Sequence, residues 1–381
     1  MINRRKFVSA ALAVPFASTV PAYAVDRKTL QVYTDGDTNI SNWWNDIIKP
    51  AFEKANPDLT LNVTITRGVA DGNVTIAQRV LAAMQSKTDP QVDYFEEIDP
   101  ADVKGSVEAG LWAKADASNV PNFAMVNKLA IESPFKMPYR GSQVLIAYDS
   151  AKIKEAPKTF ADIMAWAKAN PGRFTYGRPD KGGSGRNFVV RAVHEANGKD
   201  PSMFTPDNFD QKLADERLGK AWELLRELHP NTYGGGTYPA GNTPTLQLLA
   251  QGAVDMISAW SDQALQAKKQ GVLPESVKLV QLQDLALCGG FAFSAIPTNA
   301  TNMDGALKLA NFMLSKEMQI SCVREIGGFP AVDWSNLPPE LKAEYIDVIP
   351  VSIPTFPSGP WNQAMNDGWY KNVATNIKQG S

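Results

Sequence analysis

Cysteine and histidine are scarce in this sequence of 381 residues, which has two of each. His194 and His229 lie within helical patterns and no metal-ligand spacing surrounds them, so we expect no metal site. A nucleophile elbow and a Walker phosphate-binding loop are also missing, and we expect no cofactor. In an oxidising compartment Cys288 and Cys322 could form one disulfide, or they could remain two separate buried thiols. Both alternatives stay open, because sequence alone does not show whether the two residues meet.

A basic surplus and long apolar runs are missing as well. Mean hydropathy is −0.24, and no run after residue 25 approaches the ~20 apolar residues that span a bilayer. Without its first 24 residues the chain keeps 35 Lys and Arg (38 minus 3) against 40 Asp and Glu, a net charge near −5. This balance argues against nucleic acid and anionic membrane surfaces as partners. We expect the remaining 357 residues (381 minus 24) to be soluble.

Residues 1–24 have the three parts of a secretory signal peptide. A basic start is followed by an apolar stretch of about a dozen residues, too short to span a bilayer. The stretch closes with the small-x-small pattern Ala22–Ala24, which predicts cleavage before Val25. Arg4 and Arg5 resemble a twin-arginine export signal, although ordinary signals also carry arginine pairs. No lipidation cysteine follows, so the sequence predicts a protein that is free in the periplasm.

Short β-rich runs alternate with amphipathic helical patterns along the whole chain, which indicates an α/β fold with largely parallel sheets. Residues 30–34 read as the first strand, and a helix follows in which Pro50 predicts a kink. Thr159 and Asp162 form a capping-box pattern that opens a later helix. A chain of this length exceeds the usual size of one hydrophobic core, so we expect two lobes.

Several local patterns, taken in order, resemble the type II periplasmic solute-binding proteins of ABC importers, a family with maltose, polyamine and thiamine receptors. The subgroup of thiamine and polyamine binders is the most similar. The segments that carry the resemblance are Pro138–Asp149, Pro157–Ile163, Gln251–Met256, Ala295–Pro297 with Ala306–Glu317, and Gly327–Ala331.

The resemblance implies two discontinuous lobes, each with a mixed, mostly parallel sheet flanked by helices. Lobe I would comprise residues 25–143 and 294–328, and lobe II residues 148–291 and 332–381. Hinge segments would cross near 143–148, 291–296 and 328–332. The implied function is capture of a small polar organic solute in the cleft, which then closes, and delivery to an ABC permease in the inner membrane. We expect a monomer and no catalysis.

Ligands of open α/β sheets bind beyond the carboxyl ends of strands, which selects the candidate residues in lobe I. Loops after two expected strands contribute acidic side chains, whose alternative role is a solvated loop. Adjacent helix positions do not share a face, and Trp44 fits the core pattern, so Trp43 is the candidate. The candidates of this lobe are Asp37, Thr38, Trp43, Glu96 and Glu97.

The other candidates follow from chemistry near the expected hinge and in lobe II. The turn at Gly183–Gly185 opens a helix and offers free backbone N–H groups to an anion or a polar oxygen. Arg140 could clamp an anionic group or pair with an acid in the hinge. The indole of Trp260 could stack on a ring or on a sugar face. The candidates here are Tyr139, Arg140, Gly183, Ser184, Gly185, Arg186, Trp260, Ser261 and Phe329.

The ligand class remains open between an organic anion, a cationic amine or thiamine-like ring, and a sugar. The arginines favour an anion, and Arg140 is the main reason for that preference. A second function is also open, because Glu96, Glu97 and Asp262 could form the acid pair of an exported glycosidase-like hydrolase.

Overall fold

The computed structural model describes residues 28–66, 72–344, 354–357 and 359–380. The expected signal peptide lies outside these residues. The described chain is a mixed α/β structure, which confirms the predicted fold class. Its strands form the order β2-β1-β3-β8-β4-β6-β5, with β7 and β9 also paired to β4.

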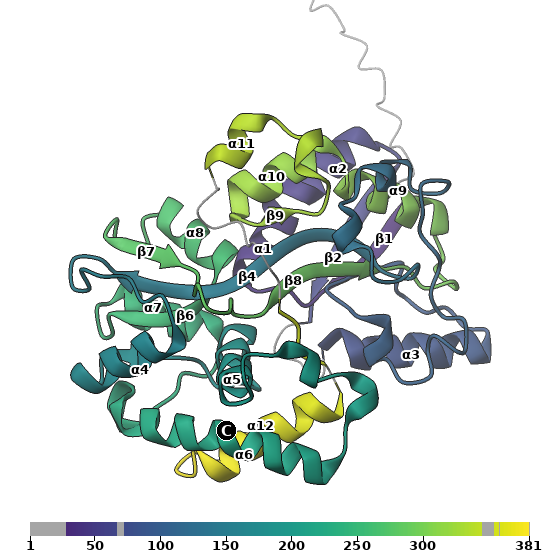
Figure 1. Cartoon of the computed structure of the whole chain (residues 1–381). Coiled ribbons are helices and arrows are strands. Elements are labelled where there is room, and N and C mark those ends of the chain that lie inside the picture. The colour runs from purple at the N-terminus through teal and green to yellow at the C-terminus, as the bar shows by residue number, and fades with distance from the viewer. Residues whose placement is uncertain (1–27, 67–71, 345–353, 358, 381) are drawn as a thin grey trace, which may run out of the picture.

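Strand β4 (Met137–Asp149) is the longest strand and connects two groups of strands. Its first half pairs antiparallel with β8 (Gly289–Ala295) and β9 (Phe329–Pro330). Its second half pairs antiparallel with β6 (Met256–Trp260) and β7 (Val277–Val280). In Figure 1, β4 runs across the molecule, with β1 and β2 near one end and β6 and β7 near the other.

The remaining strands give each group a parallel part. In the first group β1 (Lys28–Thr34) pairs parallel with β2 (Leu59–Ile65) and with β3 (Tyr94–Glu96). In the second group β5 (Phe174–Thr175) pairs parallel with β6. The carboxyl ends of β1 and β3 therefore lie at the same edge of the first group, where a ligand site is expected.

Buried apolar side chains form four clusters, and among the described residues none of these clusters joins the two groups of strands. Neighbouring residues of one strand face opposite sides of the sheet. Tyr94 belongs to one cluster of the first group and Phe95 to the other. Met256 and Ile257 divide in the same way in the second group. We therefore propose two lobes, each with its own core on both faces of its sheet.

The clusters place the passages between the lobes. The first passage lies inside β4, between Tyr139 and Val144. The second lies between Cys288, which packs in lobe II, and Phe291, which packs against lobe I. The third was expected near 328–332, but residues 331, 332, 337 and 341 still pack in lobe I. Since Phe356 packs against lobe II, we propose that the chain returns to lobe II after residue 341.

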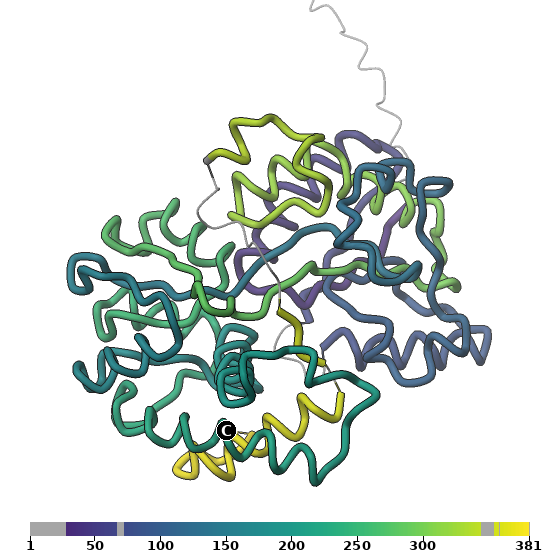
Figure 2. Tube along the Cα trace, viewed as in Figure 1, coloured from purple at the N-terminus to yellow at the C-terminus, as the bar shows by residue number. Residues whose placement is uncertain are grey.

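Helices cover both lobes, and the structure gives the following bounds. Those of lobe I are α1 (Thr38–Trp43), α2 (Lys49–Ala55), α3 (Gly72–Ser86), α9 (Met303–Met313), α10 (Lys316–Ile326) and α11 (Pro339–Glu344). Those of lobe II are α4 (Phe160–Ala169), α5 (Gly183–Ala196), α6 (Gln211–Leu228), α7 (Asn242–Ala250), α8 (Ser261–Lys269) and α12 (Pro360–Asn372). In Figure 2 the C-terminal segment that contains α12 lies along α6, so the end of the chain returns to lobe II.

Proline shapes the first helical segment. Between α1 and α2 the chain forms a π-helical turn over Trp44–Ile48, directly before Pro50. Proline has no N–H to donate, and its ring clashes with the carbonyl four residues earlier. The wider π turn removes that conflict, so the expected kink takes this form.

The two cysteines are both free thiols. Cys288 packs in a lobe II cluster and Cys322 in a lobe I cluster, where its thiol contacts the Phe329 carbonyl. Of the two alternatives left open by the sequence, the structure supports separate buried thiols and contradicts the disulfide.

Candidate functional site

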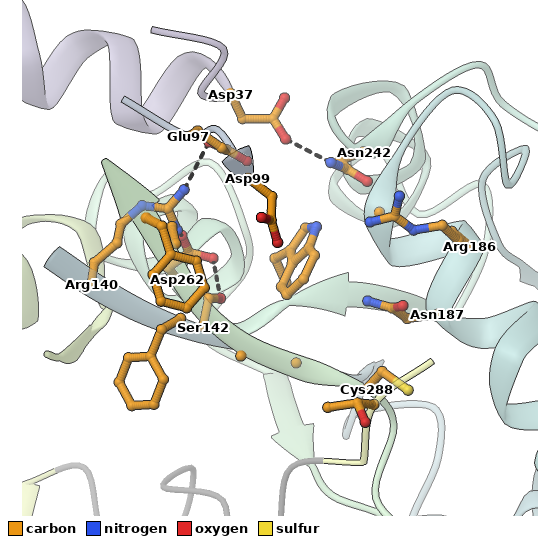
Figure 3. Close-up of a pocket in the computed structure, with 18 of the residues that line it drawn as sticks. Asp37, Glu97, Asp99, Arg140, Ser142, Arg186, Asn187, Asn242, Asp262 and Cys288 are labelled. Carbon is orange, nitrogen blue, oxygen red and sulfur yellow. Dashed lines mark hydrogen bonds and ion pairs between the residues drawn. The ribbon is translucent and has the colours of Figure 1, made fainter. Parts of the chain in front are cut away.

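A pocket of about 480 Å³ lies between the two lobes, with the middle of β4 and the start of β8 along its floor. Figure 3 shows its polar residues projecting from opposite walls. Those from lobe I and the floor are Asp37, Asn39, Glu97, Asp99, Asp102, Arg140 and Ser142. Those from lobe II include Arg186, Asn187, Asn242, Asp262, Gln263 and Asn362.

The lobe I wall is acidic because the segments that follow β1 and β3 place carboxylates there. Asp37 follows β1, while Glu97, Asp99 and Asp102 follow β3. Glu97 adopts φ of 60°, a left-handed conformation that is uncommon for a residue with a side chain. Such strain is often found at functional sites, and here it accompanies a carboxylate that reaches Arg140.

Arg140 is bound by acids of both lobes. Its guanidinium lies 3.1 Å from Glu97 Oε2 and 3.4 Å from Asp262 Oδ2, and its Nε donates to the Tyr139 hydroxyl at 2.9 Å. Burial alone would lower the pKa of Arg140, but the charges of Glu97 and Asp262 outweigh it and raise that pKa. Arg140 therefore neutralises two pocket carboxylates and is not a free clamp for an anion.

Asp262 joins the lobes at the floor of the pocket. It lies in the first turn of α8 and accepts hydrogen bonds from Ser142 Oγ at 2.7 Å and Asn39 Nδ2 at 3.3 Å. Together with the Arg140 ion pair, these contacts attach the start of α8 in lobe II to the floor and to α1. Asp262 is only 4 % exposed, and these contacts pair its buried carboxylate.

A second interlobe contact lies at the mouth of the pocket. Asn242 Nδ2 of lobe II donates to Asp37 Oδ2 of lobe I at 2.6 Å (Figure 3). The side-chain oxygen of Asn242 (Oδ1) accepts hydrogen bonds from the backbone N–H and the hydroxyl of Ser184, at 3.0 and 2.9 Å. Ser184 therefore fixes the orientation of the amide that bridges the lobes.

Glycines allow α5 to approach its neighbours at the lobe II wall. A Cβ on Gly183 would lie 2.7 Å from the Trp260 ring, so the missing side chain lets the indole lie against the helix start. A Cβ on Gly185 would lie 1.9 Å from the Gly177 carbonyl oxygen, so only glycine fits there. Trp260 itself is half-buried and lines the pocket.

The structure brings part of the predicted site together. The predicted residues that line the pocket are Asp37, Glu97, Arg140, Gly183, Arg186 and Trp260. Four other predicted residues lie behind the lining. Tyr139 accepts a hydrogen bond from Arg140, and Ser184 donates to Asn242. Ser261 Oγ accepts from the Gln143 N–H at 3.2 Å, and Gly185 packs on Gly177.

The remaining four predicted residues also lie outside the pocket lining. Thr38 begins α1, but its exposed side chain is not part of the lining, whereas Asn39 and Ile40 are. Phe329 is buried in β9, where it pairs with Gly141 of β4. The structure corrects both interpretations, because local backbone direction decides which neighbour faces the cleft.

Trp43 is the third correction. It is 1 % exposed and donates from Nε1 to Ser321 Oγ of α10 at 2.9 Å, while Trp44 packs on Tyr94 of the sheet. The helical segment is enclosed between the sheet and α10, so both indoles are buried on different sides. Both tryptophans are therefore core residues, and the prediction that Trp43 faces the cleft is wrong.

Glu96 is the fourth. Its side chain is fully buried beneath the pocket and accepts a hydrogen bond from Thr34 of the neighbouring strand. Burial raises the pKa of Glu96 to about 8, with a further contribution from the charge of Glu97. Glu96 is still part of β3, whereas Glu97 lies beyond its end, so only Glu97 reaches the pocket.

The sequence interpretation missed several lining residues. Asp99 and Asp102 follow the same strand as Glu97, and the rule that selected Glu97 would have included them. Asp99 is paired with Lys136 of lobe I. Asn187 is adjacent to the predicted Arg186, whereas no local signal marks Asn242, which reaches Asp37 only through the packing of the two lobes.

Two further observations bear on function. Among the described residues, no group of three or more His, Cys, Asp or Glu side chains could hold a metal ion. Over the same ranges, none of the helices combines the length and the apolar character needed to cross a membrane.

The fold and the interlobe pocket are those of a binding protein, and comparison with known families agrees. The chain belongs to the family of bacterial extracellular solute-binding proteins, whose model matches residues 48–346. The family assignment makes the chain a solute-binding protein. The resemblance found in the sequence is thereby confirmed, and nothing in these matches supports the alternative of an exported hydrolase.

Two curated relatives extend over most of the chain. Protein YnjB of Escherichia coli (strain K12) is 25% identical over 336 residues, covering 83% of this chain and 84% of that protein. The putrescine-binding periplasmic protein SpuD of Pseudomonas aeruginosa (strain UCBPP-PA14) is 24% identical over 406 aligned positions, covering 99% of each.

Solved structures show the same fold. The spermidine/putrescine ABC transporter substrate-binding protein PotD from Streptococcus pneumoniae has a TM-score of 0.67 and 16% identity, covering 90% of this chain and 98% of that one. A periplasmic thiamin binding protein has a TM-score of 0.64 and 17% identity, covering 91% of this chain and 96% of that one.

Proposed function

We propose that this chain is a monomeric periplasmic receptor that captures a small organic solute carrying a cationic amine between its lobes and delivers it to an ABC permease. The predicted signal peptide and the extracellular family to which the chain belongs support the compartment. The proposal involves reversible binding and no catalysis. Of the three carboxylates considered for hydrolysis, Glu96 is buried beneath the pocket, and Glu97 and Asp262 are paired with Arg140.

The charge of the pocket is the observation that carries the choice of a cation. Five carboxylates line it, namely Asp37, Glu97, Asp99, Asp102 and Asp262. Among the described residues, the lining contains two cations, Arg140 and Arg186, and Lys136 pairs with Asp99. The described lining is therefore richer in carboxylates than in basic side chains. A cationic ligand would reduce that excess, and a cleft with low-dielectric walls concentrates its effect.

The preference for an anion, which rested on Arg140, is replaced for a structural reason. Arg140 is 7 % exposed and already contacts two carboxylates, so its charge is satisfied within the protein. The half-buried Trp260 also lines the pocket and offers its indole to the organic part of the ligand. Two of the similar proteins are named for organic cations, the diamine putrescine and the thiazolium compound thiamin, which agrees with a cationic ligand.

A thermal-shift screen of the mature protein against amines, vitamins, sugars, phosphonates and sulfonates tests the proposal. Binding stabilises the folded state by about 2.7 kcal/mol at a hundredfold excess over Kd. We expect the hits to carry an amine or another organic cation. Hits confined to sugars or to purely anionic compounds would overturn the cationic assignment.

A charge variant sharpens the test. Asp102→Asn removes one exposed carboxylate from the pocket wall, and Asp207→Asn removes an exposed one of lobe II that is not in the pocket lining. Loss of one nearby charge is worth about 1 kcal/mol, so Asp102→Asn should weaken an amine hit roughly fivefold. Calorimetric titration should show no change for Asp207→Asn, and equal affinities for both variants would contradict the role of the acidic wall.

A further inference from the structure

The lobe II wall of the pocket contains two polar side chains that the protein leaves without partners. Asn187 is 8 % exposed and lines the pocket, yet among the described residues its amide has no hydrogen-bond partner. Arg186, the preceding residue, also has no ion pair or hydrogen bond from its guanidinium within those residues. Figure 3 shows both side chains extending from α5 toward the pocket.

Both residues lie in the first two turns of α5, a helix of 14 residues. The first N–H groups of a helix have no acceptor within the helix, and its dipole favours negative charge at this end. The N–H of Ser184 is used by Asn242 and that of Arg186 by the Gly182 carbonyl. Gly183 lines the pocket and has no side chain to cover its own N–H.

Of the two side chains, Asn187 is buried and Arg186 is exposed at the pocket wall. A buried amide is more stable when a ligand supplies its missing hydrogen-bond partner. Arg186 lies close enough to Asp102 and Glu97 for their charges to act on it, but no ion pair with either forms. The guanidinium therefore remains available to the pocket, where it offers a fork of donors that fits carboxylate, phosphate and sulfonate groups.

We propose that Arg186, Asn187 and the start of α5 form a subsite for an anionic oxygen-bearing group, and that the ligand is dipolar. Its cationic group faces the carboxylates of lobe I, as in the function proposed above on which this inference rests. Its anionic group contacts lobe II. Each lobe then binds one end of the same molecule, and closing the cleft brings both ends into contact.

The subsite also determines what is rejected. A diamine of the same length would place its second ammonium beside Arg186, and this like-charge contact is a means of discrimination. A dianion would place its second charge against the acidic wall of lobe I. Only the dipolar molecule satisfies both walls.

Three matched sets of compounds test this inference by thermal shift and calorimetry on the mature protein. One set contains dications, one contains dipolar compounds and one contains dianions, and each set has linear and aromatic members. The linear members are 1,5-diaminopentane for the dications, 5-aminopentanoate for the dipolar compounds and glutarate for the dianions. We expect hits among the dipolar compounds and at least tenfold weaker binding of the matched dications. Hits confined to dications would overturn the anionic subsite and leave the proposed function intact. Hits confined to dianions, or no hit in any set, would overturn both.

Arginine variants localise the effect. Arg186→Gln should weaken the dipolar hit at least tenfold and leave its dication partner unchanged or bound more tightly. Arg186→Lys keeps the positive charge but not the paired N–H donors of the guanidinium. Its affinity for the dipolar hit should lie between that of the original protein and that of Arg186→Gln. Arg226→Gln, at an exposed position of α6, is the control and should change neither affinity. An unchanged preference in Arg186→Gln would show that the subsite lies elsewhere.

Discussion

At the scale of single residues, Glu96 and Glu97 show how two adjacent acids acquire different roles. Glu97 reaches Arg140 at the pocket wall, while Glu96 lies beneath it with its carboxyl hydrogen-bonded to Thr34. Its second oxygen has no partner in the described structure. Such a group is more stable as the neutral acid, because an unpaired buried charge is far more costly than a neutral carboxyl.

Glu96 should make the stability of the protein depend on pH. Its pKa is raised from 4.5 to about 8 in the folded state, so the folded protein holds a proton that the unfolded chain loses. The stabilisation is fully present below about pH 4.5 and is lost as the pH rises through 8, by up to about 1.4 kcal/mol for each pH unit. Glu96→Gln should remove this loss, which urea unfolding at pH 5.5 and pH 8 measures.

The control for that experiment is Glu108→Gln, at an exposed position of the same lobe. It should keep the pH dependence of the original protein. If Glu96→Gln and Glu108→Gln lose the same free energy of unfolding between the two pH values, Glu96 is not the neutral acid described above.

The cysteines give a second prediction at this scale. Burial raises the pKa of both the Cys288 and the Cys322 thiol to about 12, and both are at most 4 % exposed. The thiolate is the reactive form, so the folded protein should react negligibly with a disulfide reagent at pH 7.5. Two thiols per chain should react after unfolding in guanidinium without reductant. Fewer than two would mean that a disulfide forms.

At the scale of elements, short signals in the sequence predicted where elements begin, but not which side faces the pocket. Thr159 and Asp162 form the predicted capping box at the start of α4. Pro50 changed the geometry of its helix, as predicted, but through a π turn. In the same segment the assignment of Trp43 to the pocket was wrong, because a helix enclosed on two sides buries both neighbouring indoles.

Helix α5 offers a prediction about close packing. Gly185→Ala would bring a methyl group to 1.9 Å from a backbone oxygen of Gly177, so α5 must shift. Overpacking of this kind costs about 1–3 kcal/mol, or several degrees of Tm measured by calorimetry. Gly219→Ala is the matched control, since its Cβ would meet nothing within 4 Å inside α6. That change should stabilise the protein by about 0.5–1 kcal/mol. A Gly185→Ala protein as stable as the original would contradict this packing.

At the scale of the whole molecule, the two lobes have separate cores and are joined by polar contacts. The lobes meet at the pocket through Asp262 with Arg140 at the floor, and through Asp37 with Asn242 at the mouth. A few polar contacts of this kind are weak enough to break and reform when a ligand enters and leaves.

The contact at the mouth can be tested by a change of charge. Asn242→Asp keeps an acceptor for Ser184 but places a carboxylate against Asp37. The repulsion should shift the ligand-free protein toward an open form, seen as a larger radius of gyration in small-angle X-ray scattering. In the double variant with Asp37→Asn the original radius should return. No change in the single variant would show that this contact does not hold the cleft.

Part of the candidate site could be predicted from local sequence signals, whereas residues brought in by distant segments could not. Asp37 and Glu97 followed from the rule for carboxyl ends of strands, and Gly183 and Arg186 from a glycine turn before a helix. Asn242 and the pairing of Arg140 with Asp262 join residues more than 100 positions apart in the chain. Whether Arg140 was a ligand clamp or a structural ion pair depended on those distant partners.

The sequence by itself determined the α/β class, the expectation of two lobes and the family, because hydrophobic periodicity, capping and ordered motifs are local properties of the chain. The tertiary structure alone decided that the thiols stay apart and that Glu96 and Trp43 are buried. It also decided which pocket charges are already paired. Burial and ion pairing depend on which distant segments pack together, and local sequence does not specify that packing.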